Sequence, residues 1–186
     1  MSFVHLHNHS EYSLLEASCR VKTLVKKAAE YQMPAVALTD NGNMFGAIEF
    51  YFAALDKNVK PIIGLDAYLA PGSRTQKGQN RDEIQKPNTR IVLLAQNLDG
   101  YRNLCQISTI GYQEGFYYKP RTDWELLEEH SEGLIATSGC LGGLVNQLIM
   151  KEEFDAALKA ASRFQDIFGN DNFFIELQDH GLPEDA

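Results

Sequence analysis

Apolar runs alternate with helical patterns along this chain, and this alternation constrains the fold most strongly. The runs predicted to be strands are Ala35–Thr39, Pro61–Leu69, Arg90–Ala95, Leu134–Thr137 and Phe173–Leu177. The predicted helices are Val21–Gln32, Phe45–Lys57, Gly100–Tyr112, Leu144–Met150 and Phe154–Phe168. Strands that are apolar throughout and separated by helices are typical of a parallel sheet built from βα units. The pattern predicts an α/β fold, as a barrel-like closure or a doubly wound sheet.

Three of the five histidines lie within five residues near the N-terminus: His5, His7 and His9. Phe3–His7 has strand-forming residues, and alternate side chains of a strand share one face. Imidazoles on one face can converge on Zn, Mn, Fe or Ni. A surface strand whose histidines happen to alternate is the competing interpretation.

The composition is that of an ordinary globular domain with an acidic balance. The chain has 186 residues, 44% hydrophobic and 23% charged, with a formal net charge of −8. This length allows one domain with a sizeable core. An acidic surface is a poor partner for nucleic-acid phosphates. Three scattered cysteines argue against a disulfide framework and fit a reducing cytoplasm.

Two local sequence patterns predict a loop and the start of a helix. Residues 71–88 have little apolar content and are expected to form a long exposed loop. Thr122 and Glu125 have the spacing of a capping box, which places Thr122 at the N-cap of a helix ending near His130. No apolar run is long enough to span a membrane, and no basic-then-apolar leader is visible.

Metal-capable or acidic side chains follow or interrupt several of the predicted strands. They are His7 and His9, then Asp40 with Asn41, then Asp66, and then Cys140. In βα barrels, functional groups gather at the carboxyl ends of strands. Asp66 stands in an apolar run, where a buried carboxylate needs a partner or a metal. Asp40 can equally be a turn or helix-cap residue.

The remaining candidates have alternatives of equal weight. Glu16 is either a metal ligand in a loop that folds back or a solvated acid. Cys140 is either a thiolate ligand or a small buried hydrophobe. His5 can orient neighbouring ligands from outside the metal's own shell. His180 follows the last predicted strand and is either functional or a turn residue.

The motifs together resemble the PHP (polymerase and histidinol phosphatase) domain family. The segments that carry the resemblance are His5–Ser10, Tyr12–Glu16, Leu38–Gly46, Lys60–Gly64, Leu93–Ala95, Gly100–Leu104, Gly115–Arg121, Gly133–Gly142 and Phe173–Leu177. They cover essentially the whole chain. The later segments resemble the branch found at the N-terminus of bacterial DNA polymerase III alpha subunits.

The resemblance implies a distorted (β/α)7 barrel of mostly parallel strands, here truncated before the last strands, so that residues 1–186 form an incomplete PHP domain. Family members with an intact pocket bind up to three metals and hydrolyse phosphate esters, including 3′–5′ exonuclease cleavage of DNA. Other members have lost ligands, and their domain is structural and holds a separate proofreading exonuclease subunit.

Matching the family's ligands to this sequence gives a mixed set. His7, His9, Glu16, Asp66 and Cys140 stand at positions where the family places ligands. Asn41 and Arg90 stand where the family has histidine. An amide is a poor ligand for a transition metal, and a permanently charged guanidinium opposes metal binding. The expected cofactor is therefore Zn, Mn or Mg at a reduced site, or no metal at all.

The resemblance leaves three functional hypotheses. The leading one is the PHP domain of a cytoplasmic replicative DNA polymerase, with a degenerate metal site that serves stability and docking. Its partners would be DNA, through the rest of the polymerase, the proofreading exonuclease and other holoenzyme subunits, and no membrane. The alternatives are an active metal-dependent phosphoesterase with 3′–5′ exonuclease activity and a free-standing phosphatase of a small substrate. No catalytic residue is assigned.

Overall fold

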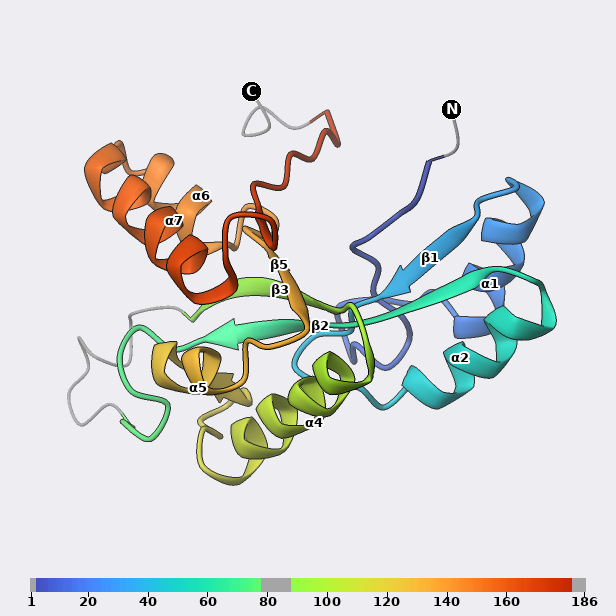
Figure 1. Cartoon of the computed structure of the whole chain (residues 1–186), viewed down its shortest axis with the longest axis horizontal. Helices are drawn as coiled ribbons and strands as arrows, with labels where there is room; N and C mark the ends of the chain where they lie inside the picture. Colours follow the sequence, from blue (N-terminus) through green and yellow to red (C-terminus); the bar gives the residue numbers. More distant parts are fainter. Residues whose placement is uncertain (1–2, 78–87, 182–186) are drawn as a thin grey trace.

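The computed structural model describes residues 3–77 and 88–181, which form a curled sheet with helices around it (Figure 1). The strands are β1 (Ala35–Leu38), β2 (Lys60–Leu69), β3 (Thr89–Ala95), β4 (Arg121–Thr122), β5 (Leu134–Thr137) and β6 (Phe173–Phe174). The helices are α1 (Val21–Glu30), α2 (Ala47–Asp56), α4 (Leu98–Gln113), α5 (Trp124–Glu129), α6 (Leu144–Ile149) and α7 (Phe154–Phe168).

The sheet is mixed and open. Its strand order is β1-β2-β3-β5-β6, and the short β4 pairs with β2. β3 is antiparallel to both β2 and β5, whereas the β1–β2, β2–β4 and β5–β6 pairs are parallel. Within the described ranges no pairing joins β1 to β6, so the barrel closure that the resemblance implied is not seen.

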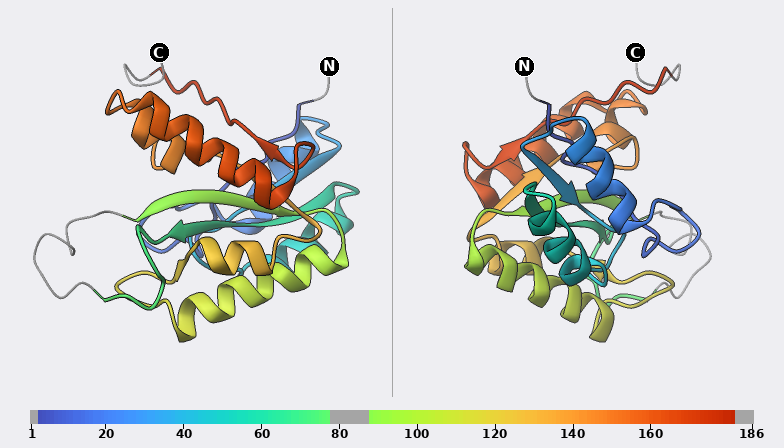
Figure 2. Two further views of the ribbon diagram at one scale, coloured as in Figure 1. Left: turned by 60° about the vertical axis from the view of Figure 1, so that its left-hand side comes forward. Right: turned by 90° about the vertical axis from the view of Figure 1, so that its right-hand side faces the viewer.

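Alternate residues of the strands serve two different purposes. Leu65 and Leu69 of β2 and Leu93 of β3 pack in one large core with residues of α4, α5 and α7. These helices lie around the outside of the curled sheet (Figure 2). The intervening residues, including Asp66 and Arg90, face the opposite side. Because the period of a strand is two, packing the helices on one face leaves the other face to Asp66 and Arg90 together with apolar residues such as Val92.

The helices α1 and α2 cover one face of β1. Val36 and Leu38 pack with Val25 of α1 and Phe50 of α2 in a second core cluster. Ala37 lies on the other face with Val92 and Leu94 of β3. Helices therefore cover the outer side of β1, β2, β3 and β5, and the inner side carries the candidate site beside this apolar cluster.

Several sequence expectations are corrected by the structure. Residues 3–7 do not form a regular strand, although the segment runs beside β1, where the backbone N–H of Ala37 donates to the carbonyl of His5 at 2.9 Å. The α5 N-cap is Asp123 and not Thr122, because the Asp123 carboxylate accepts from the N–H of Leu126. β6 ends at Phe174. The helices and the strands β1, β2, β3 and β5 lie where the sequence predicted them, within about two residues.

The expected loop at 71–88 falls largely outside the described residues. Its first part is held to the fold by Arg74, whose Nη1 lies 3.0 Å from Asp123 Oδ1. None of the helices in the described ranges is both long and apolar enough to cross a membrane.

Candidate metal site

The N-terminal segment brings two histidines onto the inner face of the sheet. Thr39 N–H donates to the carbonyl of Asn8 at 2.8 Å, and the Asn8 side chain donates to the carbonyl of Ala37 at 3.1 Å. These contacts fix Asn8 toward β1, so its neighbours His7 and His9 project the other way. Their ring centroids lie 5.0 Å apart.

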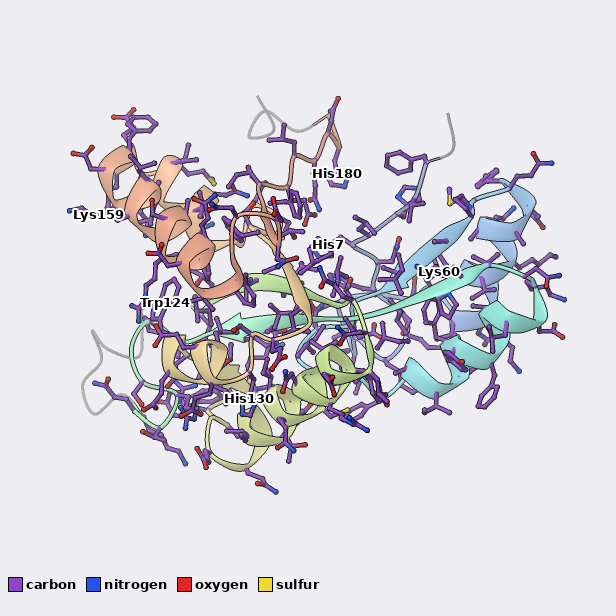
Figure 3. All side chains as sticks on the ribbon, in the orientation of Figure 1. His7, Lys60, Trp124, His130, Lys159 and His180 are labelled. Atoms are coloured by element: carbon purple, nitrogen blue, oxygen red, sulfur yellow. The ribbon has the colours of Figure 1, made fainter. Side chains whose placement is uncertain are left out.

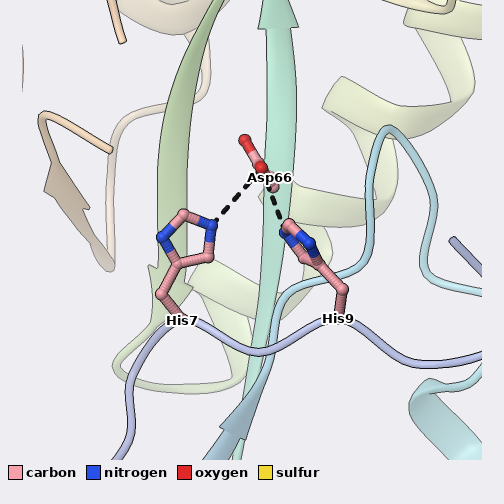
Figure 4. Close-up of side chains that lie close together, drawn as sticks. All are labelled: His7, His9 and Asp66. Carbon is pink, nitrogen blue, oxygen red and sulfur yellow. Dashed lines mark hydrogen bonds and ion pairs between the residues drawn. The ribbon is translucent and has the colours of Figure 1, made fainter. Parts of the chain in front are cut away.

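Both histidines meet Asp66 of β2 (Figure 4). Nε2 of His9 lies 3.1 Å from Asp66 Oδ2, and Nε2 of His7 lies 3.4 Å from the same oxygen. One ligand atom from each residue falls within 4.8 Å of the others. Among the described residues this is the one group of three or more His, Cys, Asp or Glu side chains so close together. We call His7, His9 and Asp66 the trio.

Asp66 is fully buried, and one of its oxygens lacks a partner. Its Oδ1 is the one buried side-chain nitrogen or oxygen without a hydrogen bond in the described part of the chain. Burial alone would raise the pKa of Asp66, but His7, His9 and Arg90 hold it below its ordinary range. The carboxylate is therefore ionised and has an acceptor to spare, as a cation ligand needs.

Arg90 of β3 supplies a cation next to the trio. Its Nη1 lies 2.8 Å from Asp66 Oδ2, the oxygen that both histidines contact, and also donates to Asn41 Oδ1. Burial alone would lower the pKa of Arg90, but Asp66 and Glu16 raise it, so the guanidinium stays charged. The side chain also stacks over the ring of Tyr68 at 4.8 Å. A fixed positive charge thus occupies part of the pocket.

Glu16 binds this guanidinium and is separate from the trio. Its carboxylate accepts from Arg90 Nη2 at 2.7 Å, Asn41 Nδ2 at 2.7 Å and Lys119 Nζ at 2.8 Å. Burial would raise the pKa of Glu16, but Lys119 and Arg90 lower it to about 2. The structure therefore shows Glu16 engaged by cations and an amide, and its role as a metal ligand stays a prediction.

The loop after β1 carries Asp40 and Asn41 to this place. Gly42 has φ +64°, and a Cβ there would approach Pro120 Cγ at 2.8 Å, so only glycine suits this turn. Asp40 is buried and accepts from Ser10 N–H, Ser10 Oγ and Ser13 Oγ at 2.6–2.7 Å. Asp40 thus fixes the Ser10–Ser13 turn and lies behind the pocket.

Glu176 is the site residue that the sequence analysis missed. Its Oε1 lies 2.7 Å from Nδ1 of His7, and Thr137 donates to its Oε2. Glu176 follows β6 and lies within Phe173–Leu177, a segment of the family resemblance, but nothing in the sequence pairs it with His7. Burial would lower the pKa of His7, but Asp66 and Glu176 raise it to about 10.

Three other candidates lie outside the trio. Cys140 is half-buried in the loop after β5, where its carbonyl accepts from Asn146 at 2.9 Å. His5 is exposed, with its ring 4.8 Å from that of Phe3. His180 is exposed in the C-terminal segment; Figure 3 labels it together with His7 and with His130, which lies far from the pocket at the end of α5. Their expected roles stay predictions.

The donor chemistry fits one metal ion. Two imidazoles and a carboxylate with a spare buried oxygen suit Zn or Mn, held by His7, His9 and Asp66. The residues do not fit a pocket for several ions, because Glu16 and Asn41 are bound to Arg90 instead of facing the trio. A metal bound here would act as a Lewis acid or lower the pKa of bound water.

A family model with the description PHP domain matches residues 5–180. The chain belongs to the PHP family. This PHP chain is 50% identical over 187 residues to DNA polymerase III subunit alpha of Deinococcus radiodurans, covering 98% of this chain and 14% of that protein. It is 47% identical over 182 residues to the protein of the same name from Borreliella burgdorferi, covering 98% of this chain and 16% of that one.

The match lies in the N-terminal region of these alpha subunits. The PHP chain spans about a seventh of their length. Similarity to solved structures is weaker. An amidohydrolase from Chromobacterium violaceum, solved with bound sulfate and no metal, matches with a TM-score of 0.49 and 14% identity. The match covers 83% of this chain and 74% of that one.

Proposed function

We propose that this chain is the PHP domain of a replicative DNA polymerase III alpha subunit, and that its pocket is a reduced metal site that serves stability and docking rather than hydrolysis. The full protein would then be a DNA-directed DNA polymerase, a nucleotidyltransferase of the cytoplasm. Its identity of 50% and 47% to two alpha subunits over nearly the whole chain supports this assignment.

The observation that carries the proposal is the guanidinium of Arg90 on Asp66. Hydrolysis by a two-metal mechanism needs ions that clamp both the attacking and the leaving oxygen. Arg90 holds the carboxylate oxygen that both histidines contact, and its other nitrogen binds Glu16 at 2.7 Å. These contacts join β2, β3 and the N-terminal loop, which supports a pocket that serves the stability of the domain.

A nuclease assay tests the absence of hydrolysis. The protein is incubated with a single-stranded oligonucleotide carrying a free 3′ end, in Zn²⁺, Mn²⁺ or Mg²⁺. The expected result is no shortening beyond that of the His9→Ala variant. Shortening from the 3′ end that disappears in His9→Ala would overturn the proposal.

One observation favours a second candidate, a metal-dependent phosphoesterase with 3′–5′ exonuclease activity. Asp66 Oδ1 is buried without a partner beside two histidines, which is what a single metal would satisfy. In that case Arg90 would bind the substrate's phosphate rather than block the site. This candidate would be distinguished by two results together: hydrolysis of the oligonucleotide, and release of Arg90 from Asp66 and Glu16 when a phosphate ester binds.

The proposed partners follow from the alpha-subunit assignment. We propose that the domain contacts the proofreading exonuclease and other holoenzyme subunits, and that DNA is bound by the rest of the polymerase, because this chain has a net charge of −8. We also propose that the open sheet belongs to a distorted (β/α)7 barrel completed within the longer polypeptide. Co-purification of the alpha and proofreading subunits, reduced when the pocket is destabilised, tests the docking role.

A further inference from the structure

The segment after β6 contacts the ring of His7 on the side away from Asp66. His7 has two ring nitrogens, and Nε2 is the one that faces Asp66, at 3.4 Å from Oδ2. The other nitrogen, Nδ1, lies 2.7 Å from Glu176 Oε1. The exposed fraction is 9% for the His7 side chain and 15% for Glu176, so water competes little for this contact.

Glu176 is itself held in a fixed geometry. Its backbone N–H donates to Ser138 Oγ at 2.9 Å, and Thr137 Oγ1 donates to its Oε2. Both partners lie at the end of β5, and Gln178 donates to Oε1 from the other side. Two side chains therefore hold the carboxylate, and Ser138 holds its backbone, before it meets the histidine.

The contact also shows that Nδ1 of His7 carries a hydrogen. Gln178 Nε2 lies 3.2 Å from the same Nδ1, and an amide N–H would need a bare nitrogen there. The carboxylate is closer, at 2.7 Å, and can only accept. Nδ1 therefore donates its hydrogen to Glu176, and Nε2 is the atom that faces Asp66.

We propose that Glu176 is the positioning residue of this site: its hydrogen bond to His7 Nδ1 fixes the ring so that Nε2 is presented to a metal ion shared with His9 and Asp66. This inference rests on the proposed reduced metal site. A carboxylate on the far nitrogen of a ligand histidine fixes its tautomer and increases its basicity. His9 has no such support, since within the described residues its hydrogen bond is made through Nε2 to Asp66.

The test has one arm that needs no metal. The chain is labelled with ¹⁵N-histidine, and the proton on His7 Nδ1 is followed by NMR in the metal-free protein. A slowly exchanging Nδ1 proton is expected in the wild type and is expected to be lost in Glu176→Ala. Glu129→Gln on the exposed surface of α5 is the matched control and should leave it unchanged. Absence of this proton in the wild type, or its persistence in Glu176→Ala, overturns the inference.

Glu176→Gln keeps an acceptor of the same length without the charge, so it separates orientation from folding. It should retain the Nδ1 proton with faster exchange, and it decides the question if the alanine variant does not fold; unchanged exchange would contradict the inference. In the second arm, calorimetric titration with Zn²⁺ should give about tenfold weaker binding for Glu176→Ala and an intermediate value for Glu176→Gln. Equal affinities would also contradict it. A wild type that binds no Zn²⁺ would count against the metal site, and the NMR arm would then decide alone.

Discussion

The guanidinium of Arg90 and the carboxylate of Asp66 lie 2.8 Å apart, on adjacent antiparallel strands. The oxygen involved is the one that both His7 and His9 contact. A histidine at position 90 could share a metal with this carboxylate, whereas arginine repels one. The balance between guanidinium and metal at Asp66 is therefore the property that distinguishes a structural pocket from a hydrolytic one.

The first prediction concerns removal of the positive charge of Arg90. Arg90→Gln should strengthen Zn²⁺ binding by about tenfold or more, because a like charge about 4 Å away opposes a cation by on the order of 4 kcal/mol near a protein surface. Calorimetric titration measures the affinity. Arg102→Gln is the control, since Arg102 is an exposed arginine on α4 that pairs with the exposed Asp99. Weaker binding in Arg90→Gln would show that Arg90 supports the site.

The second prediction concerns acid stability. The pKa of Glu16 in the folded chain is about 2, below its ordinary value of 4.5, so its carboxylate stabilises the fold above pH 4.5. That contribution is lost as the pH falls toward 2. The difference in unfolding free energy between wild type and Glu16→Gln, measured by urea denaturation, should therefore shrink across this window.

Glu129→Gln is the control for the acid experiment, because Glu129 is exposed on α5. Its difference from the wild type should stay small throughout. A Glu16→Gln difference that does not change between pH 4.5 and 2 would mean that Lys119 and Arg90 do not hold this carboxylate in solution.

The sequence predicted most elements because their signals are local. The strand Leu134–Thr137 and the helix Phe154–Phe168 have the predicted bounds, since an apolar run and a helical stripe each define their own ends. Residues 3–7 are strand-forming but pair too little to form a regular strand. The direction of β3 was not predictable either, because no local signal distinguishes an antiparallel strand from a parallel one.

The candidate site was predictable in part for the same reason. The spacing of His7 and His9 and the buried position of Asp66 are visible in the sequence, and the structure brings them together. Glu176 was not found as a site residue, although Phe173–Leu177 carries part of the family resemblance, because its contact with His7 spans 169 residues. The shared binding of Arg90 by Asp66 and Glu16 likewise depends on three segments that meet only in the fold.

The third prediction concerns the turn that carries Glu16. Asp40→Asn should destabilise the fold by about 3 kcal/mol, because the buried carboxylate accepts three hydrogen bonds from Ser10 and Ser13. Urea unfolding measures the loss. Asp171→Asn, at an exposed position, should change stability by less than about 0.5 kcal/mol. Equal effects of the two variants would contradict the assignment of Asp40 as the anchor of this turn.

The fourth prediction concerns the helices on the outer face. Phe164 of α7 is 1% exposed and packs with its ring centroid 4.6 Å from Trp124 and 5.2 Å from Phe173. Phe164→Ala should lower the unfolding free energy by about 3–5 kcal/mol, since it leaves a cavity in the core. Leu158→Ala on the same helix is the control, because Leu158 is 69% exposed. A small loss at Phe164 would mean that α7 is not part of the main core.

The most direct test of the reduced metal site is the number of tightly bound metal ions per chain. It is measured by elemental analysis after equilibration with Zn²⁺ or Mn²⁺ and removal of the excess. We expect no more than one ion per chain, lost in His9→Ala. Two or more ions per chain that depend on His7, His9 and Glu16 would contradict it, because Arg90 could not then hold Asp66 and Glu16 as the structure has them.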